Sequence, residues 1–227
     1  MAEKKSIKGR LLIIIGAVLL LSALSLVFYN NYRQKASNDE MLTILSQVSD
    51  KIPQIEQPDN SNQSSSDNSH LIVNPDDFSG DNSLQPEQND NSNIEEPYIE
   101  VEQRQYIGIL NIPSVGLEFP VMSDWTYDDL YDSPCRYSGS VATSDIIIAA
   151  HNYRYFFGPI DNLNSGDKLI FTAADGKVYT YSVITSEIIS GDDANSLRDN
   201  SDEWDMTLFT CTWTGTSRLV VRAILDE

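Results

Sequence analysis

Cys211 and Arg218 lie on either side of a short stretch near the C-terminal end of the 227-residue chain. The run Met206–Cys211 alternates as a strand would, and Arg218 opens the next apolar run, Arg218–Leu225. If Thr212–Ser217 forms a hairpin loop, Cys211 pairs with Arg218, with their Cβ atoms about 5 Å apart on one sheet face. The core face then holds Met206 and Leu208 of the first run and Leu219, Val221, Ala223 and Leu225 of the second, so the pair should project from the core. A cation that close favours thiolate over thiol, as a nucleophilic cysteine requires.

His151 directly follows the apolar run Asp145–Ala150, at a strand exit where a side chain can enter a cleft. A nucleophilic cysteine needs a proton carrier, and acyl transfer also needs a group that stabilises the oxyanion. Cys211, His151 and Arg218 supply these three functions, so the sequence indicates covalent acyl transfer. A histidine on the surface or satisfied in the core, and a cysteine that only packs in a strand, are the alternatives.

The elements that must position these residues belong to a folded all-β domain of about 130 residues, which is large enough for a real core. The predicted strands are Tyr106–Ile112, Leu117–Val121, Asp145–Ala150, Lys168–Phe171, Val178–Ile184, Met206–Cys211 and Arg218–Leu225. Asp175-Gly176 predicts a tight hairpin turn. Helical spacing is expected only at Asp128–Tyr131 and Phe156–Leu163. Seven or eight strands with little helix favour a closed barrel or a sandwich.

The N-terminal part of the chain predicts a membrane anchor. Leu11–Phe28 contains no charged residue, and as a helix of about 27 Å it would span the hydrocarbon core of a bilayer. Lys4, Lys5, Lys8 and Arg10 precede it, so the positive-inside rule keeps residues 1–10 cytoplasmic and sends the following chain outside. A cleaved signal peptide is the alternative.

Residues 29–97 are expected to form an extracellular linker that is largely disordered, apart from a short amphipathic stretch around Met41–Val48. Pro53–Pro97 is rich in Asn, Ser, Asp, Gln and Pro and contains no Lys or Arg. Such a segment buries too little apolar surface to offset the entropy of ordering its backbone. We therefore predict a flexible tether that leads to a catalytic domain at residues 98–227.

Composition excludes several classes of protein. The formal net charge of −19 argues against nucleic-acid binding, which needs a basic face. The acidic pairs Asp128-Asp129 and Asp192-Asp193 lack the spacing of a calcium loop, so we expect no metal site and no cofactor. Two cysteines are too few for a disulfide-stapled scaffold. Cys135, in the loop-like stretch DSPCRYSGS, is interpreted as a structural or free thiol.

The run TLFTC at Thr207–Cys211, the following Arg218 and the stretch AAHN around His151 resemble the motifs of the sortases. Sortases are membrane-anchored cysteine transpeptidases of Gram-positive cell surfaces. The resemblance covers about Tyr106–Leu225 and includes GILNIPSVGLEFPV and LNSGDKLIF. It implies a closed eight-stranded sortase β-barrel with one or two short helices.

The resemblance also implies a role for each site residue. Cys211 would be the nucleophile, His151 the general acid and base, and Arg218 the group that positions substrate and stabilises the oxyanion. Thr210 would add a hydroxyl or amide contact to the same oxygen. Arg222 lies on the same strand face as Arg218, but only Arg218 lines up with Cys211.

The implied reaction begins with attack on an LPxTG-like sorting signal at the C-terminus of a secreted protein. A thioester forms, and an amine of the cell-wall precursor, such as the lipid II peptide, or a pilin lysine resolves it. The segment Ser190–Trp204 would cover the groove and recognise substrate, or else be a solvated acidic loop. The alternatives for the whole protein are an extracellular cysteine peptidase or amidase, and a surface β domain without catalysis.

Overall fold

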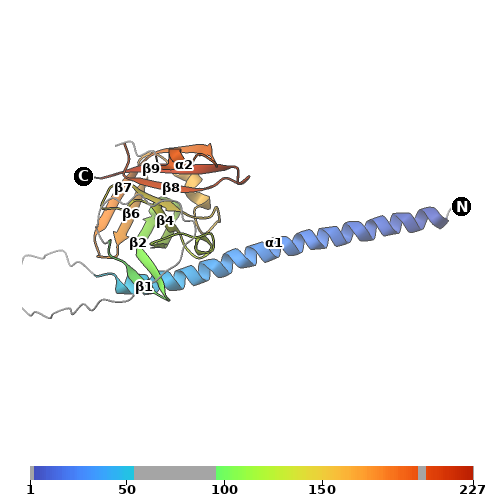
Figure 1. The fold of residues 1–227 in the computed structure, drawn as a ribbon. Coiled ribbons are helices and arrows are strands. Elements are labelled where there is room, and N and C mark those ends of the chain that lie inside the picture. Colours follow the sequence, from blue (N-terminus) through green and yellow to red (C-terminus); the bar gives the residue numbers. More distant parts are fainter. Residues whose placement is uncertain (1–2, 54–95, 199–202, 227) are drawn as a thin grey trace, which may run out of the picture. The chain divides into compact units, whose positions relative to one another are not determined.

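The strands form a single closed barrel in the computed structural model, which describes residues 3–53, 96–198 and 203–226 (Figure 1). Their order is β1-β2-β3-β4-β5-β8-β9-β7-β6, and β2 also pairs with β6. The second pairing closes the sheet into eight strands, with β1 added beside β2. The strands are β1 Ile99–Val101, β2 Arg104–Ile112, β3 Leu117–Met122, β4 Cys135–Ser138, β5 Ile146–Ala149, β6 Lys168–Ala173, β7 Val178–Ser190, β8 Met206–Cys211 and β9 Ser217–Leu225. The predicted eight-stranded closed barrel is confirmed.

Helical elements are few outside the N-terminal helix. The helices are α1 Glu3–Lys51 and α2 Ala194–Arg198, and the 3-10 turns are η1 Pro113–Val115, η2 Asp129–Tyr131 and η3 Gly158–Asn162. Two of these turns lie where helical spacing was predicted. The hairpin turn predicted at Asp175-Gly176 is also present: Gly176 has a φ of 86°, and its N–H donates to the Ala173 carbonyl at 2.9 Å.

Side-chain alternation divides the apolar residues between the inside and the outside of the barrel. On β8, Met206 and Leu208 belong to the interior cluster, whereas Phe209 belongs to a second cluster on the outer face. The neighbouring strand β5 divides in the same way, with Ile148 inside and Ile147 outside. Strand β8 is therefore buried on both faces until it reaches Cys211, which is partly exposed.

Helix α1 continues well beyond the predicted anchor. Residues 29–51 are helical, so the expectation that the linker is largely disordered is wrong for this stretch. The physical reason is burial: Met41, Ile44, Val48 and Ile52 recur at helical spacing and are all buried. Met41 joins the interior cluster, the other three join the outer cluster, and α1 contacts β1, β2 and β3. The rest of the predicted tether, residues 54–95, lies outside the described residues.

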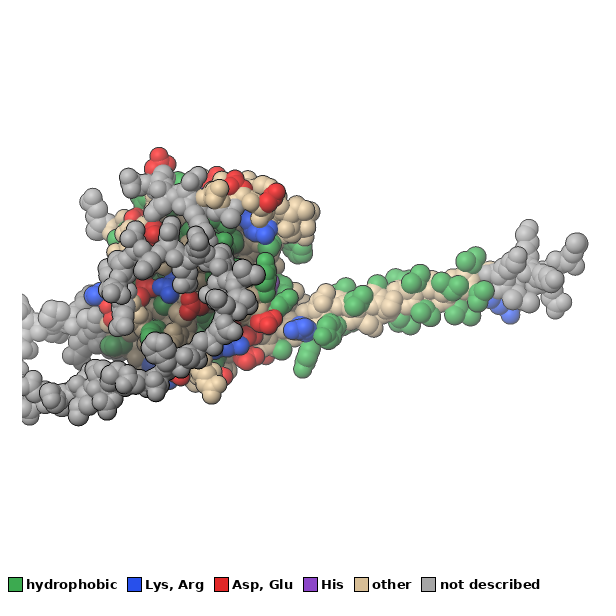
Figure 2. Space-filling model, viewed as in Figure 1, with side chains coloured by type: hydrophobic (Ala, Val, Ile, Leu, Met, Phe, Trp, Pro, Cys, Tyr) green, Lys and Arg blue, Asp and Glu red, His purple; other side chains and the backbone are tan. Residues whose placement is uncertain are grey.

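The earlier part of α1 is apolar and exposed. Side chains from Leu11 to Phe28 are largely uncovered by protein (Figure 2). The segment Gly9–Lys51 is the one helix in the described part of the chain that is long and apolar enough to cross a membrane, with a mean hydropathy of 2.9 in its most apolar window. This finding is compatible with a single-pass anchor.

Candidate active site

Cys211 and His151 lie at the ends of two adjacent parallel strands: Cys211 is the last residue of β8, and His151 comes two residues after β5. Strand β5 pairs in parallel with β8, with Ala149 opposite Phe209, and each site residue lies two positions further along its chain. The Ala150 N–H donates to the Phe209 carbonyl at 3.3 Å, which extends the pairing to the edge of the site. Because parallel strands end at the same sheet edge and lie about 5 Å apart, Cys211 and His151 emerge side by side.

Arg218 approaches Cys211 from the other neighbouring strand. The antiparallel register of β8 and β9 places Cys211 directly opposite Arg218, which confirms the predicted pairing. The guanidinium donates to the carbonyls of Gly215 and Ser217 at 3.1 and 3.2 Å. An added Cβ at Gly191 would lie 3.0 Å from the same guanidinium, so this glycine leaves room for the Arg218 side chain.

The imidazole of His151 packs against aromatic rings. Its centroid lies 4.6 Å from the Tyr131 ring and 4.9 Å from the Tyr153 ring. The Nε2 atom is buried and has no hydrogen-bond partner among the described residues. Burial lowers the pKa of His151 below its ordinary value of 6.5, because desolvation penalises the charged imidazolium. The resting imidazole is therefore neutral near pH 7.

Thr210 points to the opposite face of β8 from Cys211. Its side chain is buried, and its hydroxyl donates to the Ala150 carbonyl at 2.8 Å. The hydroxyl proton is used in that bond, which links Thr210, just before Cys211, to Ala150, just before His151. A contact from Thr210 to an oxyanion would therefore have to come from its backbone amide.

Arg222 is buried in a different environment. Its side chain is 2% exposed, and it donates to the Ser196 carbonyl at 2.6 Å and to the Thr207 hydroxyl at 3.0 Å. It also lies 3.4 Å from a Glu187 carboxylate oxygen, and its guanidinium carbon is 4.3 Å from the Trp204 ring centroid. Arg222 thus joins α2 to β8 at a distance from Cys211.

The second cysteine, Cys135, lies in a buried environment. Cys135 opens β4 instead of lying in a loop as expected, and it is fully buried. The sequence missed this strand because β4 has only four residues and directly follows a proline. Its thiol donates to the Ser133 carbonyl at 3.4 Å, and burial raises its pKa far above the ordinary value. Both cysteines are free thiols.

A hollow lies at the other end of β8, on the same face as Cys211. Its volume is about 180 Å³, and it is lined by Ser138, Gly139, Asp145, Ile147, Leu197, Trp204 and Thr207. Leu197 and Trp204 belong to the segment Ser190–Trp204, which was predicted to cover a groove. Cys211 lies four positions after Thr207 on β8, a distance of about 13 Å along a strand.

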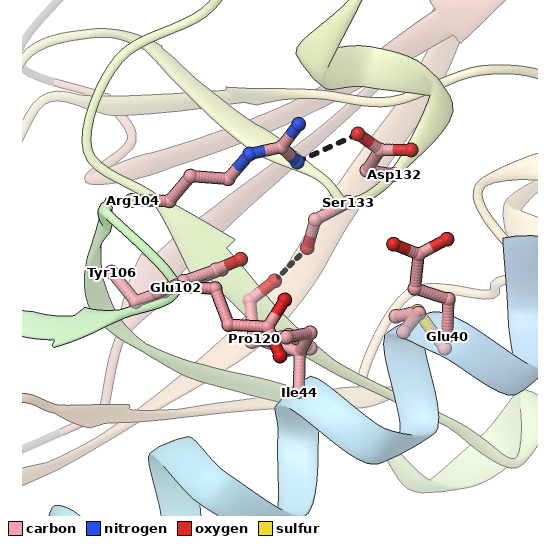
Figure 3. Close-up of a pocket in the computed structure, with 9 residues that line it drawn as sticks. Glu40, Ile44, Glu102, Arg104, Tyr106, Pro120, Asp132 and Ser133 are labelled. Atoms are coloured by element: carbon pink, nitrogen blue, oxygen red, sulfur yellow. Dashed lines mark hydrogen bonds and ion pairs between the residues drawn. The ribbon is translucent and has the colours of Figure 1, made fainter.

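A second hollow of about 210 Å³ lies between α1 and the barrel (Figure 3). Glu40, Met41 and Ile44 of α1 face Arg104 and Asp132 there. Arg104 and Asp132 form an ion pair at 2.6 Å. None of Cys211, His151 or Arg218 lines either of these hollows. Within the described residues, no group of three or more His, Cys, Asp or Glu side chains could hold a metal ion.

Sequence reasoning did not identify Tyr131 and Tyr153 as neighbours of the histidine. Tyr131 was part of a predicted helical turn, and Tyr153 lies in an irregular stretch two residues after His151. Aromatic residues close to a candidate histidine in sequence were the available signal. They form no periodic pattern, so their common contact with the imidazole depends on the tertiary fold.

Known proteins resemble this chain in sequence and in fold. The chain is 26% identical over 113 residues to sortase D of Bacillus subtilis (strain 168), a match that covers 48% of this chain and 56% of the relative. Sortase C1 of Streptococcus agalactiae has a similar fold, with a TM-score of 0.50 and 24% identity over 56% of this chain and 71% of that one. A sortase D5 transpeptidase of Clostridium perfringens matches with a TM-score of 0.47 and 26% identity, over 54% of this chain and 79% of that one.

The family assignment rests on the barrel. The Sortase domain family model matches residues 110–226, which is more than half of the chain and includes His151, Cys211 and Arg218. This match shows that the chain belongs to the sortase family, and the closed barrel is the fold expected of it.

Proposed function

We propose that the protein is a cysteine transpeptidase in which Cys211 forms a thioester with a sorting signal. The observation that supports this proposal is the strand register, which pairs Cys211 with Arg218 and sets the strand before His151 beside the strand of Cys211. His151 takes the thiol proton, and the thiolate adds to a backbone carbonyl carbon. Arg218 donates to the oxyanion, and His151 returns the proton to the leaving amine as the peptide bond breaks.

The second half of the reaction uses the same groups. An acceptor amine attacks the thioester carbonyl and gives a proton to His151, and the Cys211 thiolate leaves. Transfer exceeds hydrolysis only where the acceptor is held in place better than water is. The acceptor we propose is an amine of the cell-wall precursor, such as the lipid II peptide, or a pilin lysine.

The hollow beside Thr207 supports an LPxTG-like sorting signal on secreted proteins as the substrate. An extended peptide with its scissile carbonyl at Cys211 would run along β8 for about 13 Å before reaching that hollow, which corresponds to three or four peptide residues. The walls include Ile147, Leu197 and Trp204. An apolar side chain upstream of the scissile bond would bury its surface there, as the leucine of such a signal requires.

The cellular setting we propose follows from α1. The N-terminus would lie in the cytoplasm and the barrel outside, with residues 11–28 crossing the cell membrane once. This arrangement would place the barrel where secreted proteins and wall precursors are available, and residues 98–227 would form the catalytic domain.

The test uses the full chain in detergent micelles with an LPxTG-containing peptide, with and without an oligoglycine amine. Mass spectrometry is expected to show an adduct on Cys211 that hydroxylamine removes, and a joined product when the amine is present. Cys211→Ala should form no adduct, whereas Cys135→Ala serves as the matched control and should keep it. Hydrolysis at a rate that the amine does not affect would instead identify a peptidase. If Cys211 stays unmodified, the protein would be a surface β domain that does not catalyse this reaction.

A further inference from the structure

The imidazole of His151 is part of a three-ring cluster. Tyr131 and Tyr153 each contact it, and their own centroids are 6.4 Å apart. The two tyrosines therefore meet the imidazole from different directions. Ring contacts of this kind restrict the rotamers open to a side chain and exclude water from its faces.

Tyr131 is held firmly by its neighbours in the chain. Leu130 is buried in the outer cluster, and Asp132 forms the 2.6 Å ion pair with Arg104. The Ser133 hydroxyl donates to the Pro120 carbonyl at 2.5 Å. These three contacts fix η2 on the barrel, and with it the backbone of Tyr131. Tyr131 itself is 42% exposed, so the direction of its ring depends on the contacts of its own side chain.

Helix α1 reaches the same tyrosine. The Ser37 hydroxyl donates to the Tyr131 carbonyl, and the guanidinium carbon of Arg33 lies 5.9 Å from the Tyr131 ring centroid. Arg33, Ser37 and Met41 follow one another at four-residue spacing, so they share one helix face. Met41 is buried on the barrel, beside the hollow in Figure 3 that Asp132 and Ser133 also line.

We propose that Tyr131 is a positioning residue for His151, and that α1 sets Tyr131 through Arg33 and Ser37. The inference rests on the proposed function, in which His151 exchanges a proton with Cys211 and with the leaving amine. Proton transfer needs the donor and acceptor within hydrogen-bond reach, so an imidazole that turns away slows the chemistry and leaves peptide binding intact. The helix that follows the membrane anchor thereby becomes part of the catalytic unit.

The first arm of the test compares two replacements of Tyr131 in the full chain in micelles. Tyr131→Ala is expected to lower kcat for thioester formation roughly 10- to 100-fold with little change in KM, because small displacements of a reacting group carry large rate penalties. Tyr131→Phe keeps the ring and should restore most of the loss. Tyr127→Ala is the matched control, since this tyrosine is 75% exposed and lies four residues away.

The second arm leaves the tyrosine in place and removes the contacts from α1. The combined variant Arg33→Ala, Ser37→Ala should lower kcat roughly 3- to 10-fold, because the ring remains but loses part of its support. The combined variant Lys35→Ala, Ser46→Ala is its control: it removes the same charge and hydroxyl from α1. The Ser46 hydroxyl donates only within the helix, to the Thr43 carbonyl.

A third readout follows the histidine itself by NMR. The sequence has two histidines, so His70→Gln leaves a single imidazole signal. The titratable rings that contact this imidazole are those of Tyr131 and Tyr153, and Arg33 lies beyond Tyr131. Cys211 ends the neighbouring strand β8, and Arg218 lies one strand further, on β9. In Tyr131→Ala the imidazole gains water, so the pKa of His151 should rise towards its ordinary value.

Normal kcat and an unchanged His151 pKa in Tyr131→Ala would overturn the inference, even if the melting temperature fell. Equal rates for the two combined α1 variants would overturn the part assigned to the helix. Failure of the proposed function has a different signature: full activity of His151→Ala would remove the histidine from the reaction altogether.

Discussion

Arg218 and Arg222 lie on the same face of β9, but their contacts predict different losses. Arg218, whose backbone pairs with Cys211, would keep its charge as Arg218→Lys but lose the planar fork of donors. The barrier should therefore rise by about 2–4 kcal/mol, and kcat should fall accordingly. Arg222→Lys cannot reach the Ser196 carbonyl, the Thr207 hydroxyl and the Glu187 carboxylate together. It should lower the melting temperature and raise KM by loosening α2 beside the hollow.

Steady-state kinetics of both variants on one peptide, with thermal unfolding alongside, would check this division. If Arg218→Lys is nearly as active as the wild type, and Arg222→Lys has a very low kcat with normal stability, the oxyanion role would belong to Arg222.

His151 gives a second prediction, on pH and stability. Its pKa in the folded chain is below the ordinary value of 6.5, so the unfolded chain binds more protons between the two values. Stability should therefore fall as pH drops through about 6.5, and this loss should be complete below the folded pKa. The melting temperature of the wild type should drop more between about pH 7.5 and pH 5 than that of His151→Gln. Parallel curves for the two proteins would contradict the lowered pKa.

The pairing of the candidate site residues could be predicted because strand alternation is local information. Strand parity and a hairpin loop at Thr212–Ser217 together predicted Cys211 opposite Arg218, and the register of β8 and β9 confirms this pairing. Strand alternation could not predict the ring contacts of His151 or the hydrogen bond of the Thr210 hydroxyl. Both depend on partners brought together by pairing across the barrel, Tyr131 in one case and the Ala150 carbonyl in the other.

Among the elements, the late part of α1 gives a third prediction. Val48 is fully buried in the outer cluster, whereas Leu42 on the same helix is 49% exposed. Val48→Ala should therefore lower the free energy of unfolding by about 1–3 kcal/mol, as removal of buried methyl groups from a core does. Leu42→Ala is the matched control and should cost much less. Chemical denaturation of the full chain in micelles would measure both, and equal small losses would mean that α1 is not packed on the barrel.

The elements differ in how far the sequence predicted them. Seven strands were predicted, because each contains enough β-branched or apolar residues to be recognised from the sequence. Strands β1 and β4 have three and four residues, too few for a period to appear, and they exist through pairing with β2 and β5. The length of α1 was missed for a related reason: the apolar face of residues 41–52 is narrow, and its helicity depends on the barrel that covers it.

For the whole molecule, the question is where the catalytic unit begins. The linker composition predicts a boundary near residue 98, but Met41, Ile44, Val48 and Ile52 bury their side chains on the barrel. The Lys51 ammonium also donates to the Glu100 carbonyl of β1 at 2.5 Å. A chain cut at residue 98 would expose the matching outer surface around Ile99, Val101 and Tyr106 to water. The anchor and the buried turns of α1 are therefore separable in function.

Two truncated chains test this separation. A chain that starts at residue 29 lacks the anchor but keeps the buried turns, so it should be soluble, fold, and act on a soluble peptide at the rate of the full chain in micelles. A chain that starts at residue 98 should melt at a lower temperature and bind apolar dyes, because the outer cluster loses three apolar side chains and the interior cluster loses Met41. Each of these side chains is worth roughly 1.5–3 kcal/mol when fully buried. It should also have a lower kcat, since Tyr131 loses Arg33 and Ser37. Equal melting temperatures and rates for the two chains would show that the catalytic unit begins at the barrel after all, and that α1 serves only to hold it at the membrane.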